Sequence, residues 1–586
     1  MRSPFQSHLI RRSFSRSVWA LLLAAAPFAQ AEQTLIDQEY SASGVKILMV
    51  SVYDALPHWG HVPVQLEIHN RTQTDLEWRV QFFGSYAGHG ANLETACRVA
   101  AGQIGQFQLS VPVTVRDWAD RSQLQVVMEG PGIDSYQTNY SSQSFGSGRK
   151  RGSRPFFLMS GELAQASWSR LEARANKQNF QADGSLLDAD SFSSDYRDWL
   201  GVTHCFISPG EMNALSGSQR AALETWLSQG GNLVLCTDSD QLDPLLTVSN
   251  ANRLNGDIRL GAGRIEIMQL EAGEISWSPF KDQLTRGPNL QPLQALYDNY
   301  GRSDWLGEKV SPPALNEGLL MGIAFLFAVA VAPVNLIWLA RKRRRHWMFA
   351  TVPLLSVAAS VVLIVSIFVG DGLGGNGNRF TLVLHQPGRA EKLLINEEYS
   401  VSGLLLNTRF KTEPNVAMIP SPGSMGISTR DLANQREYMM TSNLAGERWD
   451  QWFASRSLRG FLVTESRPSR EKVTIQTEND TLAVLSQNEA AFAAFYYVDE
   501  AGEFYHAAGI GTGIPAQLTK VDRREFEDWM NEQKKAAGPR AEQILEAIPR
   551  PGMFFARAEP GASNRTETLD SIRFRDRVLV VGRAQR

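Results

Sequence analysis

The chain has 586 residues, of which 43% are apolar, a composition typical of globular proteins and a length that allows several domains. Its formal net charge is -3, and no segment of domain length is strongly basic, which argues against a nucleic-acid-binding protein. Three cysteines are too few for a disulfide framework, and together with nine scattered histidines they form no metal-binding pattern, so the sequence predicts no metal and no cofactor.

Residues 1–31 read as a secretory signal peptide. A basic region that includes Arg11 and Arg12 precedes the apolar run Val18–Phe28, and Ala29–Ala31 forms a small-x-small cleavage site. The apolar run is too short to span a bilayer comfortably. The arginine pair also resembles a twin-arginine signal, so general secretion and twin-arginine export both remain open as the route.

Residues 32–150 have the pattern of a β-sandwich. Apolar and polar side chains alternate in at least four segments: Lys46–Tyr53, Val62–His69, Leu76–Phe83 and Gln106–Val113. Short strands at this spacing suggest a sandwich of immunoglobulin-like type, a domain that commonly serves as a spacer or a binding surface. The polar stretch Ser141–Ser153 is rich in glycine and serine and is expected to be a linker.

Residues 151–312 change to alternating strands and helices. The expected order is strand Pro155–Met159, helix Leu163–Gln178, strand Thr203–Ser208, helix Ser218–Gln229 and strand Asn232–Cys236. Ser216 and Gln219 predict a capping box at the start of the second helix. Such alternation predicts a doubly wound α/β layer with parallel strands. Asp257–Leu270 returns to a strand pattern, and Ile275–Val310 is expected to be irregular.

Two apolar runs then predict a pair of transmembrane helices, at 313–340 and 347–369, because each reaches the roughly 20 residues that span a bilayer. The intervening loop, 341–346, contains five consecutive cations: Arg341, Lys342, Arg343, Arg344 and Arg345. Cations resist translocation, so the loop is expected in the cytoplasm, in contact with anionic lipid, with both flanking parts in the periplasm. The alternative is a helical hairpin buried in a soluble core.

Asn335 is a polar residue within the first apolar run. An amide in hydrocarbon requires a hydrogen-bond partner, and the nearby Pro333 frees a backbone carbonyl. One hypothesis is that Asn335 bonds to the second helix near Pro353 or Ser356. The other is that it lies close enough to the interface to be wetted.

After the second run, residues 370–379 are rich in glycine and are expected to be a flexible linker. Residues 380–586 are expected to form a periplasmic, β-rich α+β domain. Its predicted elements include strands at Phe380–Leu384, Lys392–Ile395 and Lys472–Thr477 and helices at Asp522–Lys535 and Ala541–Ala547.

Four segments carry a resemblance to one bacterial membrane-protein family: Thr203–Cys236, Gly261–Met268, Ala332–Leu355 and Arg577–Ala584. Its members carry a class I glutamine-amidotransferase-like α/β domain before a transmembrane pair, and their genes often lie near those of MoxR-type AAA ATPases or ABC transporters. The resemblance implies an architecture more than an activity.

An amidotransferase-like domain raises the question of a cysteine nucleophile, for which Cys236 is the candidate because it ends a predicted strand. No glycine-bracketed turn follows it, and the α/β segment has no histidine after His204 to act as its base. Cys236 is therefore interpreted as structural, and His204 as a core histidine. Cys205 and Cys236 are left open as an oxidised pair. The acidic stretch that contains Asp188, Asp190, Asp195 and Asp198 is interpreted as a solvated loop.

Together these patterns predict a non-enzymatic accessory or scaffold subunit of an envelope complex, anchored in the bacterial inner membrane. Its expected partners are other membrane or periplasmic proteins. Two alternatives remain: a cysteine hydrolase or amidotransferase-like enzyme that uses Cys236, and a cell-wall or glycan-binding module.

Overall fold

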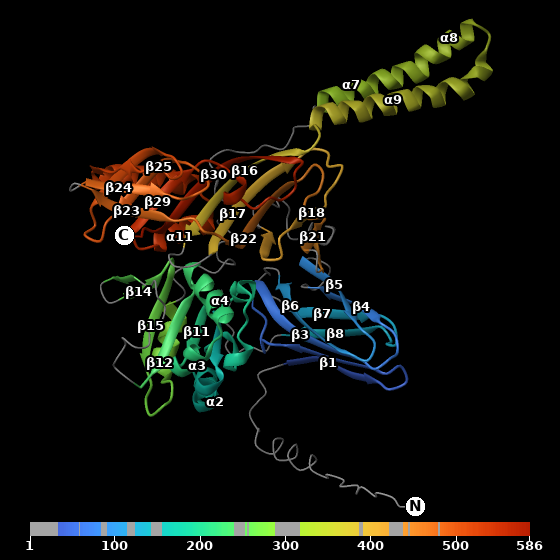
Figure 1. Cartoon of the computed structure of the whole chain (residues 1–586). Coiled ribbons are helices and arrows are strands. Elements are labelled where there is room, and N and C mark those ends of the chain that lie inside the picture. Colours follow the sequence, from blue (N-terminus) through green and yellow to red (C-terminus); the bar gives the residue numbers. More distant parts are fainter. Residues whose placement is uncertain are drawn as a thin grey trace, which may run out of the picture.

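The computed structural model describes residues 33–57, 59–83, 91–113, 123–141, 155–238, 252–254, 257–286, 317–385, 391–420, 438–443, 446–478 and 481–585. The predicted signal peptide and nearly all of the Ser141–Ser153 linker lie outside these ranges. The remaining chain combines α/β and β structure, as predicted. Figure 1 shows a body of several packed sheets, from which a pair of helices projects.

The first part of the chain forms two packed antiparallel sheets. One contains β1 (Gln33–Tyr40), β2 (Val45–Ser51), β3 (Gly60–Asn70) and β6 (Ile104–Val113). The other includes β4 (Leu76–Phe83), β5 (Ala91–Val99), β7 (Gln123–Glu129) and β8 (Tyr136–Ser141). Alternate side chains such as Val64 and Val80 face a common buried core. The four predicted strands are confirmed.

The second of these sheets continues into strands that follow the helix pair in the sequence. β20 (Tyr438–Asn443) runs parallel to β5, with Thr441 opposite Glu94, and the Thr95 hydroxyl donates to the carbonyl of Ser442 at 3.2 Å. β21 (Gly446–Asp450) and β18 (Phe410–Thr412) extend the sheet further. One sheet is therefore built from segments on both sides of the helix pair.

The α/β part has the strand order β10-β9-β11-β12-β15-β14-β13, with the first five strands parallel. Its strands are β9 (Phe156–Ser160), β10 (Asp183–Leu187), β11 (His204–Ile207), β12 (Asn232–Thr237), β13 (Asn252–Leu254), β14 (Asp257–Leu260) and β15 (Gly263–Gln269). Its helices are α2 (Gly161–Lys177), α3 (Pro209–Ala214), α4 (Gly217–Ser228) and α5 (Trp277–Arg286). The five parallel strands follow the doubly wound order in which the second strand lies outside the first.

Local sequence signals predicted several elements of this region correctly, and one prediction was wrong. The Ser216–Gln219 capping box is present at the start of α4. The strand pattern predicted at Asp257–Leu270 is confirmed as a hairpin of β14 and β15, with Gly261 at a φ of +58° in its turn. The expectation of irregular chain from Ile275 is wrong at its start, because Phe280 and Leu284 bury one face of α5 in the core.

The projecting pair consists of α7 (Glu317–Val329), the π-helical turn η3 (Ala330–Val334), α8 (Asn335–Arg341) and α9 (Met348–Asp371), with the short turn η4 (Arg345–Trp347) before α9. Two stretches, Met321–Arg341 and Met348–Ser366, are long and apolar enough to cross a membrane. Their large side chains are exposed, for example Phe325 and Leu354. The alternative of a hairpin buried in a soluble core is therefore wrong, and Figure 1 shows the pair standing clear of the body.

The last part is built on a nine-stranded sheet with the order β19-β22-β17-β16-β30-β29-β25-β26-β28. Its strands are β16 (Gly375–His385), β17 (Glu391–Ser402), β19 (Val416–Pro420), β22 (Leu458–Pro468), β25 (Phe492–Val498), β26 (Phe504–Ile510), β28 (Thr519–Val521), β29 (Met553–Ala558) and β30 (Ile572–Arg583). A small sheet of β23 (Val473–Glu478), β24 (Thr481–Ser486) and β27 (Ala516–Gln517) covers part of one face. Helices α10 (Arg523–Ala536) and α11 (Pro539–Ala547) pack on the other. Both helix predictions and the β-rich α+β class agree with this arrangement.

The prediction of a flexible glycine linker at 370–379 is wrong. α9 continues to Asp371, and β16 begins at Gly375 in the centre of the sheet. A Cβ at Gly377 would lie 2.7 Å from the carbonyl oxygen of Tyr399, so this glycine serves close packing between strands rather than flexibility.

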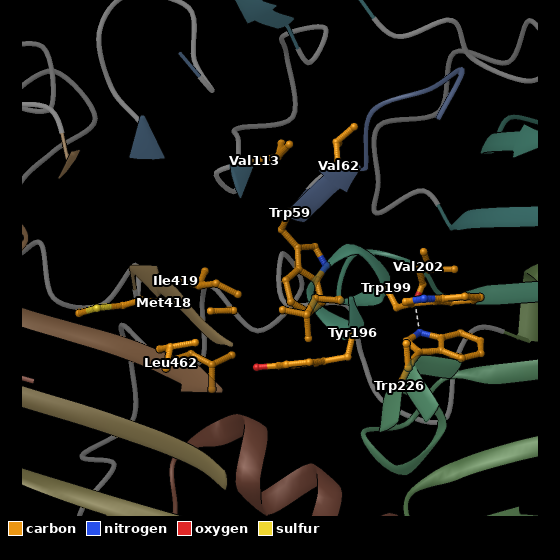
Figure 2. Packing of buried hydrophobic residues seen from close by; sticks show 14 of the residues in the cluster. Trp59, Val62, Val113, Tyr196, Trp199, Val202, Trp226, Met418, Ile419 and Leu462 are labelled. Atoms are coloured by element: carbon orange, nitrogen blue, oxygen red, sulfur yellow. Dashed lines mark hydrogen bonds between the residues drawn. The ribbon is translucent and has the colours of Figure 1, made fainter. Parts of the chain in front are cut away.

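A continuous hydrophobic core joins the parts of the body. Figure 2 shows where they meet: Trp59 and Val62 come from the first sheets, Tyr196 and Trp199 from the α/β part, and Leu462 from the last sheet. The Tyr196 hydroxyl donates toward two backbone carbonyls of the last part, those of Asn415 at 2.9 Å and Thr464 at 2.8 Å. The segments before and after the helix pair therefore form one packed body.

Candidate functional site

Cys236, the candidate nucleophile, lies near the end of β12 inside the α/β sheet and is fully buried. Burial raises the pKa of its thiol to about 12, and its sulfur lies 3.8 Å from the carbonyl oxygen of Val234. A thiolate is the nucleophilic form of cysteine, so this position suppresses reactivity. The geometry agrees with the structural interpretation.

His204 and Cys205 begin β11, beside β12. The ring nitrogens of His204 lie 3.0 Å from the Thr203 hydroxyl and 3.3 Å from the Asn232 amide, and burial lowers the pKa of His204 to about 4. Cys205 belongs to the core on one face of the sheet and Cys236 to the core on the other. A disulfide between the two is therefore excluded, and both thiols are free.

The carboxyl ends of β9 and β11 carry a small polar cluster. Doubly wound sheets bind ligands at the point where the strand order reverses, which here lies between these two strands. The Ser208 hydroxyl, which caps α3, lies 2.6 Å from a Glu162 oxygen and 3.0 Å from a Glu211 oxygen. Among the described residues, no group of three or more histidine, cysteine or acidic side chains is placed to hold a metal ion.

A buried charged site lies between the α/β part and β21, a strand that follows the helix pair in the sequence. The Arg197 guanidinium contacts Asp195 at 2.6 Å and is also ion-paired with Glu447 on β21. The Arg197 and Glu447 side chains are largely buried and that of Asp195 is 25% exposed; Asp195 also accepts from the backbone N–H of Arg197. We call Asp195, Arg197 and Glu447 the junction triad. Two carboxylates raise the already high pKa of Arg197, so this cation stays charged.

Two further titratable groups border the junction triad. The Asp198 carboxylate accepts from Ser110 and Ser193, each at 2.6 Å, and burial together with the nearby Asp195 charge raises the pKa of Asp198 to about 7. His61 on β3 is buried, and desolvation and the charge of Arg197 lower its pKa to about 3. Burial thus shifts the pKa of both Asp198 and His61 toward the uncharged form.

The interpretation of the acidic stretch as a solvated loop is therefore wrong for Asp195 and Asp198. Sequence reasoning missed both because their partners are distant: Ser110 precedes Asp198 by 88 residues and Glu447 follows Arg197 by 250. The available local signal was the adjacent run Tyr196–Trp199, whose two aromatic residues point to burial.

In the helix pair, Asn335 is buried and exchanges two hydrogen bonds with Thr351 on α9, at 2.9 and 3.1 Å. The bond crosses between the helices as hypothesised, but Thr351 replaces the expected partners. Ser356 instead donates to Val352 on its own helix at 3.0 Å. The backbone N–H of Asn335 donates to the carbonyl of Ala330, five residues earlier, as in a π-helix. This wider turn contains Pro333, which has no backbone N–H to donate.

The basic loop lies at the far end of the helix pair, away from the body (Figure 1). Arg341, Lys342, Arg343 and Arg344 are exposed, and the Lys342 ammonium stands 4.2 Å from the ring centroid of Trp338. Arg343 adopts a φ of +52°, which helps to reverse the chain. The cations are thus displayed on the outside of a tight turn.

No family model and no curated protein matches the chain. Among solved structures, β-glucuronidase 2 of Bacteroides uniformis is 8% identical over 84% of this chain and 60% of its own, with a TM-score of 0.17. Another β-glucuronidase structure from the same organism is 8% identical over 83% of this chain and 62% of its own, with a TM-score of 0.17. A β-D-mannosidase of Dictyoglomus thermophilum is 8% identical over 85% of this chain and 76% of its own, with a TM-score of 0.13. The chain thus spans about 60% of the two glucuronidases, and TM-scores this low carry no argument about fold or activity.

Proposed function

We propose that this protein is a membrane-anchored, non-enzymatic accessory or scaffold subunit of a bacterial envelope complex. The observation that carries the proposal is the parallel pairing of β20 with β5, which makes one body from the chain before and after the helix pair. A body of this kind offers a large, fixed surface to partner proteins beside the bilayer.

The same pairing supports the proposed topology. Strands cannot hydrogen-bond across a hydrocarbon core of about 30 Å, so in this arrangement both halves share one side of the bilayer. With the five-cation loop in the cytoplasm, that side is the periplasm. The loop would contact anionic lipid of the inner membrane. We also propose that the α/β part is a degenerate member of the amidotransferase-like class, on the resemblance carried by Thr203–Cys236.

The burial of Cys236 weighs against the rival function of a cysteine hydrolase or amidotransferase. Its thiol has no exposed surface, and its neighbouring strand offers His204 only as a buried, neutral side chain. A nucleophile requires access to substrate and a base within hydrogen-bond reach. Neither condition is met at this position.

The proposal is tested by chemical cross-linking in intact cells, followed by affinity purification of the full chain from solubilised membranes. The matched control is Cys236→Ser. We expect the same envelope proteins, in the same proportions, with both chains. Recovery of no envelope protein above background, or an associated hydrolytic activity that disappears in Cys236→Ser, would contradict the scaffold function.

Topology is tested separately with two reporters fused to the C-terminus. An alkaline-phosphatase reporter, active only outside the cytoplasm, should be active, and a reporter that folds only in the cytoplasm should be silent. The reverse result would place the second half inside the cell and exclude the proposed arrangement.

A further inference from the structure

Two exposed apolar side chains of the body lie close to the base of the helix pair. Among the described residues, the large apolar side chains of the body that are more than half exposed are Ile104, Leu373, Leu406 and Ile514. Single exposed apolar residues are common and need no explanation. Leu373 and Leu406, however, are 66% and 82% exposed and both lie beside the end of α9.

Backbone contacts fix the two leucines to the base of that helix. Leu373 forms a β-bridge with Leu404, whose N–H donates to Gly372 at 3.0 Å and whose carbonyl accepts from Gly374 at 3.0 Å. Leu405 is buried, and its N–H donates to the Ser455 hydroxyl at 2.9 Å. Leu406 is exposed, follows the buried Leu405 and lies two residues after Leu404, the bridge partner of Leu373.

The length of α9 places this site at the level of the lipid headgroups. Its 24 residues extend about 36 Å at roughly 1.5 Å per residue, whereas the hydrocarbon core is about 30 Å thick. If α9 enters the hydrocarbon at Met348, its end at Asp371 lies in the headgroup layer. Leu373 and the segment bridged to it then face the boundary between headgroups and acyl chains.

We propose that Leu373 and Leu406 form a second, interfacial contact with the bilayer. The occupant of this apolar site is lipid, because Leu373 follows the end of α9 by only two residues and is bridged to Leu404, two residues before Leu406. The proposal rests on the membrane anchor assigned above. It adds a point of attachment that the helix pair alone does not provide and thereby sets the orientation of the body relative to the membrane surface.

The buried native cysteines make a selective experiment possible, because Cys97, Cys205 and Cys236 are all inaccessible in the folded chain. Leu406→Cys is labelled with the environment-sensitive fluorophore NBD in the full chain. Ile514→Cys, at a site 64% exposed next to the small sheet, is the matched control. Val361→Cys, within α9, reports on the anchor itself.

Each labelled chain is reconstituted into vesicles of phosphatidylcholine and phosphatidylglycerol that contain phosphatidylcholine with a nitroxide near its headgroup or at mid-chain. We expect the headgroup-proximal nitroxide to quench the Leu406 label at least about twice as strongly as the Ile514 label. The mid-chain nitroxide should quench the Val361 label.

The outcomes separate the two proposals. If Val361 is quenched and Leu406 behaves like Ile514, the interfacial contact is excluded and the anchor stands; a protein partner would then be the occupant of the leucine site. If Val361 is not quenched either, the anchor fails and the interfacial contact fails with it.

Discussion

Arg197 in the α/β part is ion-paired with Glu447 on β21, although 250 residues and the helix pair separate them in the sequence. Asp195 shares the same guanidinium. A buried cation with two carboxylates is costly to desolvate. Its ion pairs offset that cost only when the three charged groups are well placed relative to one another. We therefore expect the junction triad to make the packing of the two halves specific.

Arg197→Met should be strongly destabilising, because it leaves Asp195 and Glu447 as adjacent buried carboxylates. We expect the free energy of unfolding of the full chain in detergent to fall by roughly 3–5 kcal/mol. The control Arg71→Met removes an exposed pair with Glu39 and should cost at most about 1 kcal/mol. Equal losses in the two variants would show that the triad contributes no more than a surface pair.

Asp198 should make stability depend on pH. Its pKa is raised from 3.8 to about 7, so the folded chain binds this proton more tightly than the unfolded chain. The associated stability is present below about pH 4 and is lost as the pH rises through about 7. Asp198→Asn removes this titration. In chemical unfolding experiments, the stability of the variant relative to the native chain should therefore increase as the pH rises from about 5 to about 8. The exposed Asp75, whose pKa is lowered, provides a control in Asp75→Asn that should show no such change.

Cys236 should resist alkylation in the folded protein. With a pKa of about 12, on the order of one thiol in ten thousand is ionised near pH 8, and the side chain is enclosed. Mass spectrometry after treatment with a maleimide should find Cys236 unmodified in the native chain and fully modified in denaturant. Rapid labelling of Cys236 in the native chain would revive the enzymatic alternative.

Asn335→Leu should weaken the contact between α8 and α9, because Thr351 loses its partner. Interhelical hydrogen bonds of this kind contribute about 0.6–2 kcal/mol. Thermal stability in detergent should fall for Asn335→Leu, and adding Thr351→Val should produce little further loss. Ser356→Ala, which removes a bond within α9 only, is the control. Fully additive effects of the first two substitutions would show that Asn335 and Thr351 do not interact.

Gly377→Ala should destabilise the last sheet, because the added methyl group would lie 2.7 Å from the Tyr399 carbonyl oxygen. Overpacking of this kind typically costs about 1–3 kcal/mol. Gly217→Ala, at an open position in the first turn of α4, should change stability by less than about 1 kcal/mol. A flexible linker would tolerate both substitutions equally, so equal and small effects would contradict the position of β16.

Short-range signals in the sequence predicted the local elements well. Ser216 and Gln219 predicted a helix start because both partners of a capping box lie within one turn, and the apolar runs predicted the helix pair from length alone. Glycine was ambiguous: at Gly377 it permits strands to approach closely, and its local context is indistinguishable from that of a linker. The junction triad was beyond prediction because Arg197 and Glu447 meet only after the whole topology has formed.

The pairing of β5 with β20 also constrains how the molecule is made. The hydrogen-bond partner of Thr95 lies 347 residues later, so the edge of β5 stays open until the ribosome has made the second half of the chain. An open edge is a template for wrong pairing. Chains truncated after the basic loop should therefore depend on chaperones and be cleared by proteases, because maturation finishes only when the second half closes that edge.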